Sequence, residues 1–271
     1  MIFPNLTLPL GYQDFSYFSQ GTNPRGIFLN RTDNIKQWFE TWDDGMGDEA
    51  YVYTQHQIFL EEGIIKHTRT SPNWEGGMVT FSTCKHRMRS VKKKSSDGRL
   101  GSAKSWVGTW IVGLCPAYLA SNTVLFIGQV LMEFPSNYDM GRFILDKHID
   151  VYAKKDAMHN PRGDLYEPKG LKLDDRQKHS HYFFEEPPNH TRSVEFYKKS
   201  PGSISNRKDK LIPKWWRDIE YVTPGGVRPP SFIFSPCWLF SKPMVWTSKK
   251  PGRACLRMST EEFSKSLRFS E

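Results

Sequence analysis

The sequence has no closely spaced cysteines. Its four cysteines, Cys84, Cys115, Cys237 and Cys255, stand far apart and form no Cys-x-x-Cys pair. A structural zinc site built from cysteines is therefore not expected. Thiols without a disulfide framework are typical of a reducing compartment, and we predict reduced cysteines in an intracellular protein.

Long apolar runs are also missing. No stretch of about 20 apolar residues occurs, and the amino terminus has no basic segment followed by an apolar run. We therefore expect no membrane partner. The expected location is the cytoplasm in a prokaryotic or viral setting, or the nucleus in a eukaryotic one.

Negative charge is in shorter supply than positive charge. Lys and Arg total 38 against 29 for Asp and Glu, which gives a net charge of +9. Such an excess favours a polyanion partner such as nucleic acid, and a merely basic protein is the equally weighted alternative. The chain is long enough for one large domain, and its 14% aromatic content supplies a core.

Two adjoining stretches dominate the pattern. In residues 73–89, a Gly-Gly turn precedes an alternating segment that is typical of a half-buried strand and ends in Lys85, His86, Arg87 and Arg89. In the second stretch, Trp106 to Gly113 and Thr123 to Glu133 indicate two apolar strands joined by a loop. We therefore expect a group of cations at the end of a buried strand.

These motifs resemble the nucleotide modification-associated domain 2 family. The resemblance lies in the order Gly-Gly, Thr-x-x-Thr-Cys-Lys-x-Arg-x-Arg and Trp-x-Gly-x-Trp-Ile-Val-Gly, followed by an apolar strand that ends in Glu. It extends over roughly residues 50 to 184, through Gly163-Asp164-Leu-Tyr166 and the Ser180-His181 pair. The chain departs from the family pattern at His86, where the family has Pro, and at Thr109, where it has Asp.

The resemblance implies a place in a system that hypermodifies DNA bases. The expected partners are nucleic acid, DNA rather than RNA, and other base-modification enzymes. The resemblance identifies no cofactor.

The sequence predicts an α+β fold with a PUA-like small β-barrel core, peripheral helices and long loop insertions. Short strands joined by loops resemble the barrels of PUA, EVE and YTH-type readers. We expect an N-terminal arm and helix over residues 1–48, a single core domain over 49–250 and a C-terminal helical tail over 251–271. The spacing of Ile35, Trp38, Phe39 and Trp42 predicts the N-terminal helix.

Cations and aromatic rings suggest how a nucleic acid would bind. Phosphate contacts are expected from the end of the central strand and the basic loop after it, at Thr83, Lys85, Arg87, Arg89, Lys92, Lys93 and Lys94. Trp74, Trp106 and Trp110 are candidates for stacking on a base, although a Trp is more often a core residue.

Three residues are candidates for catalysis. Cys84 could be a nucleophile activated by its basic neighbours, or a small buried strand residue, and the second interpretation is favoured because no acidic partner is evident. Asp164 and His181 could supply acid–base chemistry. His179 and His181, two residues apart, could instead reach one metal ion or be ordinary loop histidines.

The polar segment with Asp164, Tyr166 and His181 is too long for a simple connector. We expect it to face the segment from Thr83 to Arg89 across one pocket. The first hypothesis is a protein that binds nucleic acid or a nucleotide and recognises a modified or flipped base. The second is an enzyme of the same system that processes a base or nucleotide, and the third is a structural or partner-binding protein.

Overall fold

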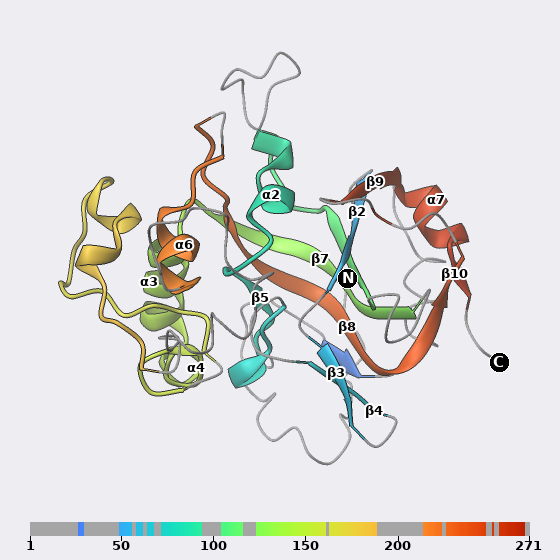
Figure 1. The fold of residues 1–271 in the computed structure, drawn as a ribbon, viewed down its shortest axis with the longest axis horizontal. Helices are drawn as coiled ribbons and strands as arrows, with labels where there is room; N and C mark the ends of the chain where they lie inside the picture. The colour runs from blue at the N-terminus through green and yellow to red at the C-terminus, as the bar shows by residue number, and fades with distance from the viewer. Residues whose placement is uncertain are drawn as a thin grey trace, which may run out of the picture.

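The computed structural model describes residues 27–29, 49–55, 58–61, 64–67, 72–93, 104–115, 123–160, 163–188, 214–223, 226–247, 251 and 255–268. They form a mixed α+β fold built on one large sheet (Figure 1). Within the described ranges, no helix combines the length and the apolar character needed to cross a membrane.

The strands are β1 (Ile27–Leu29), β2 (Glu49–Thr54), β3 (Ile58–Glu61), β4 (Ile64–His67), β5 (Thr80–Phe81), β6 (Trp110–Leu114), β7 (Thr123–Phe134), β8 (Ser231–Trp246), β9 (Leu256–Ser259) and β10 (Leu267–Arg268). The main sheet has the order β1-β8-β7-β6-β2-β9, and β5 and β10 also pair with β8. Strands β3 and β4 form a separate hairpin.

The main sheet is mixed and open. The pairs β1–β8 and β2–β6 are parallel, whereas β6–β7, β7–β8 and β2–β9 are antiparallel. Strands β1 and β9 are the two ends of the order, and among the described residues no pairing joins them into a closed barrel. Figure 1 shows β7 and β8 crossing the molecule as long curved strands, with α7 at one end and α3 and α6 at the other.

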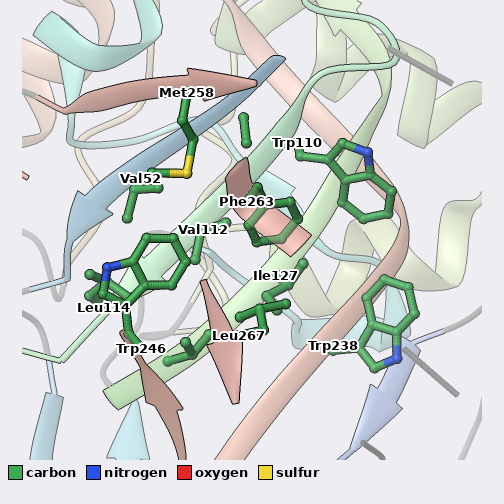
Figure 2. Close-up of a cluster of buried hydrophobic side chains, with 12 residues drawn as sticks. Val52, Trp110, Val112, Leu114, Ile127, Trp238, Trp246, Met258, Phe263 and Leu267 are labelled. Atoms are coloured by element: carbon green, nitrogen blue, oxygen red, sulfur yellow. The ribbon is translucent and has the colours of Figure 1, made fainter. Parts of the chain in front are cut away.

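Both faces of the sheet are buried, and successive residues of a strand pack into apolar clusters on opposite faces. In β2, Ala50 and Val52 belong to one apolar cluster, and Tyr51 and Tyr53 belong to the other. The first cluster lies under helix α7 (Thr260–Lys265), whose Phe263 packs into it (Figure 2). A sheet covered on both faces is a fixed platform for the loops at its edge.

The other helices are α2 (His86–Arg89), α3 (Asn137–Lys147), α4 (Ile149–Lys155) and α6 (Lys214–Glu220). Single 3₁₀ turns span Glu75–Gly77, Val91–Lys93, Gln177–His179 and His181–Phe183. Ser136 caps α3 by accepting a hydrogen bond from the Asp139 N–H. Helices α3 and α4 pack against the sheet through a third cluster that includes Met140, Val151 and Ile233.

Several predicted elements are present. The structure confirms the predicted strand from Thr123 to Glu133 as β7, whereas the strand predicted from Trp106 begins only at Trp110, as β6. The predicted C-terminal helix is α7, which starts with a capping box of Ser259 and Glu262. The predicted C-terminal tail also contributes β9 and β10 to the main sheet. The predicted helix over residues 32–45 lies outside the described residues.

Candidate functional site

The central strand ends in a sharp turn at Cys84 and Lys85. Strand β5 covers only Thr80–Phe81, and the chain then enters α2 through Cys84 at φ 57° and Lys85 at φ 47°. Two successive non-glycine residues in the left-handed region are unusual and cost about 1–3 kcal/mol each, so they persist only where their surroundings hold them. We call residues 84–89 the elbow. The cations predicted at the end of a strand therefore lie on a turn and a short helix.

Asp218 of α6 holds the elbow in place. Its Oδ1 accepts a hydrogen bond of 2.8 Å from the Cys84 N–H and lies 2.9 Å from His86 Nε2. Its Oδ2 accepts a hydrogen bond of 3.0 Å from the Tyr166 hydroxyl. The carboxylate therefore joins three segments that are far apart in the sequence, and only 7% of its side chain is exposed.

The pKa values of Asp218 and His86 both lie below their ordinary values, for different reasons. Burial would raise the pKa of Asp218, but His86, the Cys84 N–H and Arg89 together hold that pKa below its ordinary value. Burial lowers the pKa of His86 despite the nearby carboxylate. The close contact between His86 and Asp218 opposes the effect of burial on the pKa of His86 and helps to lower the pKa of Asp218. At neutral pH the pair is an ionised carboxylate beside a neutral imidazole, whose ring stacks on Tyr221 at 4.4 Å.

Arg89 is a structural cation. Its side chain is buried, and it donates from Nε to the Cys84 carbonyl at 3.0 Å and from Nη1 to the Pro230 carbonyl. Burial lowers the pKa of Arg89 to about 10, while Asp218 and Cys84 oppose the shift. The guanidinium thus ties the elbow to the start of β8.

The remaining cations predicted to contact phosphate are also mostly engaged within the protein. Lys85 Nζ donates to the Thr54 carbonyl at 2.6 Å. Lys92 Nζ lies 3.1 Å from Glu49 Oε2 and also contacts Thr109. Of the predicted cations whose side chains are described, Arg87 is the one that is exposed, and the side chains of Lys93 and Lys94 lie outside the described residues.

The predicted stacking residues lie in or against the core. Trp106 and Trp110 are fully buried, so neither presents a ring face to solvent, and Trp74 packs against the Trp106 cluster from a half-buried position. Thr83 is also fully buried. The alternative weighed from the sequence, that these indoles are core residues, describes their positions in the structure.

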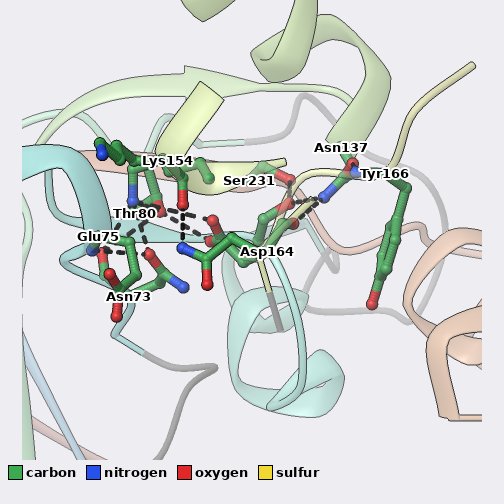
Figure 3. Close-up of polar contacts among 11 residues, drawn as sticks. Asn73, Glu75, Thr80, Asn137, Lys154, Asp164, Tyr166 and Ser231 are labelled. Atoms are coloured by element: carbon green, nitrogen blue, oxygen red, sulfur yellow. Dashed lines mark hydrogen bonds and ion pairs between the residues drawn. The ribbon is translucent and has the colours of Figure 1, made fainter. Parts of the chain in front are cut away.

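Asp164 lies at the centre of a second, completely buried network. Its Oδ2 accepts a hydrogen bond of 2.7 Å from the Thr80 hydroxyl, and its Oδ1 lies 3.8 Å from Lys155 Nζ. Lys155 also donates to Asn73 Oδ1 at 2.8 Å, and Figure 3 shows the side chains around Asp164 facing one another. The network fixes the loop at 163–166 against β5 and α4.

The two histidines predicted to share a metal ion have different surroundings. His181 contacts Glu220 through Nδ1, and its ring stacks on Trp216 at 3.7 Å. His179 lines a pocket that His181 does not line. Within the described ranges, neither imidazole belongs to a group of three side chains with metal-ligand spacing.

A pocket opens beside Asp218. It encloses about 280 Å³ when the space open to solvent is counted, and its interior is too narrow for a whole nucleobase unless its walls move. The lining residues come from the start of α3, the segment at 178–179, α6 and the residues before β8: Pro135, Ser136, Asn137, Lys178, His179, Asp218, Ile219, Arg228, Pro229 and Ser231. None of Thr83, Lys85, Asp164 and His181, which were expected to share one pocket, lines this one.

The pocket lining includes the cation Arg228, the imidazole of His179, which is neutral at pH 7, and the carboxylate of Asp218. Burial, Arg228 and Lys178 together lower the pKa of His179 to about 4. Lys178 is neutralised by Asp139 at 3.3 Å and Asp175 at 2.7 Å. Among the described residues, Arg228 and His179 make no side-chain hydrogen bond or ion pair. They are therefore available to an anion that enters the pocket.

Sequence reasoning missed Asp218, Arg228 and Lys155. Asp218 follows the motif Lys-Trp-Trp-Arg, where its helical position has no strong local signal. Arg228 stands between turn residues, and Lys155 resembles any surface lysine in a polar stretch. Their roles follow from contacts between distant segments.

Comparison of the chain with protein-family models, with curated proteins and with solved structures finds no match.

Proposed function

We propose that this protein binds nucleic acid or a nucleotide, as part of a system that modifies DNA bases, and recognises a modified or flipped base. The observation that carries the proposal is the pocket in which His179 and Arg228, among the described residues, make no side-chain hydrogen bond or ion pair. The net charge of +9 agrees with a polyanion partner. DNA in the cell interior, and the other enzymes that act on its bases, are the partners proposed.

The pocket has the parts that such recognition requires. Arg228 and His179 would hold a phosphate at the mouth, and a guanidinium provides paired N–H donors suited to phosphate oxygens. Asn137 and Ser231 already bond within the protein, so the edge of a base would contact the pocket only after its walls separate. A PUA-like barrel is the proposed fold for this role, and the curved strands β7 and β8 support it.

Binding of short DNA measured by fluorescence anisotropy tests the proposal. The affinity should fall as salt rises, because bound phosphates release counterions. Arg228→Ala should weaken binding by about tenfold or more, whereas Arg142→Ala removes the same charge from the exposed face of α3 and serves as the matched control. Arg87→Ala tests whether the exposed elbow cation also contacts phosphate. Affinity that is independent of salt and unchanged in Arg228→Ala would contradict the proposal.

The elbow favours a second candidate, an enzyme of the same system. The notable feature is that a partly exposed thiol sits in the left-handed turn, while its own N–H is held by a carboxylate that also faces His86. A nucleophile on a strained strand-to-helix turn is the arrangement of hydrolase elbows. Alkylation of Cys84 at neutral pH should then be far faster than that of Cys255, whose pKa burial raises to about 11. Equal rates would remove this candidate.

A further inference from the structure

Three side chains with metal-binding groups converge just after α4. One donor atom each from Asp156, His159 and Glu167 lies within 4.8 Å of the other two. His159 Nδ1 and Asp156 Oδ2 share a hydrogen bond of 2.7 Å, and a metal ion bound by both atoms would replace its proton. Since transition ions bind such atoms at about 2.0 to 2.2 Å, donors this close can share one ion. The cluster is separate from both the pocket and the elbow.

The backbone around the cluster is held firmly. The chain turns after α4 and returns beside itself, with hydrogen bonds from the Ala157 N–H to the Leu165 carbonyl and from the Leu165 N–H to the Lys155 carbonyl. Gly163 permits this return, because a Cβ there would lie 2.3 Å from the Lys155 oxygen. These backbone hydrogen bonds therefore fix the two neighbouring segments that carry the three donor side chains.

The side chains are positioned as well. Asp156 is buried, and its Oδ1 accepts a hydrogen bond of 2.9 Å from the Met158 N–H. The backbone of Glu167 is fixed by the Glu185 N–H, which donates to its carbonyl at 2.9 Å. His159 lies at the surface, with 75% of its side chain exposed. One side of the cluster is thus rigid and the other is open to solvent.

The chemistry of the cluster selects a class of ion. Two carboxylates this close repel each other, and a dication between them would remove that repulsion. The imidazole distinguishes the set from a purely acidic patch, because Mg²⁺ and Ca²⁺ prefer oxygen donors alone whereas zinc-like ions accept nitrogen. We propose that Asp156, His159 and Glu167 bind one divalent transition-metal ion, with water at the positions that face solvent. The ion would lie between His159 Nδ1 and the two carboxylates.

Titration of the full chain with Co²⁺ tests the proposal. A nitrogen and oxygen site gives weak visible bands, whereas a cysteine site adds an intense near-ultraviolet thiolate band, so the spectrum separates this cluster from the four thiols. We expect one Co²⁺ per chain without the thiolate band, not displaced by excess Mg²⁺. His159→Ala and Glu167→Gln should each weaken binding by at least about tenfold.

Two variants serve as controls. His148→Ala and Glu186→Gln remove the same groups from positions outside the cluster and should bind Co²⁺ as the parent chain does. Thermal unfolding without metal shows that each variant folds, which is expected because His159 is exposed and Glu167 half-buried. No bound Co²⁺, a thiolate spectrum, or binding unchanged in both His159→Ala and Glu167→Gln would overturn the proposal.

Discussion

The ammonium of Lys155 and the carboxylate of Asp164 lie 3.8 Å apart, and both side chains are completely buried. Burial lowers the pKa of Lys155 to about 8, although Asp164 opposes the shift. The pair joins the end of α4 to the loop that supports Tyr166. Its role is therefore to hold the platform behind the elbow rather than to meet a ligand.

Breaking this pair should destabilise the fold. Asp164→Asn leaves the Lys155 charge buried without its partner, and such a loss costs about 3–5 kcal/mol. Urea unfolding should show the loss for Asp164→Asn and for Lys155→Met. The neighbouring exposed Lys154→Met should change the free energy of unfolding by less than about 0.5 kcal/mol. Equal stability of Asp164→Asn and the parent chain would show that the pair contributes nothing.

Gly163 should not tolerate a side chain. A Cβ at this position would lie 2.3 Å from the Lys155 oxygen and 2.7 Å from the Asp156 carbonyl carbon, so the backbone must move. Gly163→Ala should cost about 3 kcal/mol in unfolding free energy, at the upper end of overpacking effects. Gly170→Ala is the matched control, since its nearest neighbour would be a flexible Leu173 methyl at 4.0 Å. A normal melting temperature for Gly163→Ala would contradict the close approach.

The pKa of His179 predicts a pH dependence. The unfolded chain protonates this residue near its ordinary pKa of 6.5, whereas the folded chain does so only at about 4. Between these values the unfolded state binds more protons, so stability falls as pH is lowered from about 6.5 to about 4. His179→Gln should flatten this part of the stability profile measured by urea unfolding.

Phosphate should raise the pKa of His179 if it enters the pocket. A bound anion beside His179 favours the imidazolium and so raises its pKa, which histidine NMR titration with and without inorganic phosphate would detect. Arg228→Ala is the control, because it should reduce the response to phosphate. A His179 titration that phosphate leaves unmoved would count against an anion site.

Replacement of Cys84 distinguishes the two proposed functions. For a binding protein, Cys84→Ser should leave DNA affinity within about tenfold, equivalent to less than about 1.4 kcal/mol, because the N–H that Asp218 holds is retained. For the enzyme, the same variant should lose activity on a base or nucleotide while keeping its fold. Circular dichroism of Cys84→Ser checks the fold in both cases.

The sequence predicts the sheet better than the site. The apolar runs in β2 and β7 are nearly continuous because both faces of these strands are buried. Strand β8 continues through Pro236 and Pro243, because apolar residues surround both prolines. Helix α4 was missed because its composition is polar and its two deeply buried residues, Val151 and Lys155, form no apolar face.

The elbow could not be predicted for a different reason. Cys84 and Lys85 adopt left-handed backbone angles without glycine or asparagine, so no local residue marks the turn. The conformation depends on Asp218 of α6, which lies 134 residues away in the sequence. That helix was not predicted, because turn residues stand on both sides of it. Local patterns report periodic burial, whereas this geometry is set by contacts between segments remote in sequence.

Strand β8 also dictates when the protein can fold during synthesis. It pairs with β1, β5, β7 and β10, yet it begins only at residue 231 of 271. About 200 residues separate it from β1, which corresponds to roughly 10 to 40 seconds of translation at about 5 to 20 residues per second. Until β8 leaves the ribosome, β7 and β1 lack a neighbour on one edge and the aromatic clusters remain incomplete. The main sheet can therefore be completed only near the end of synthesis.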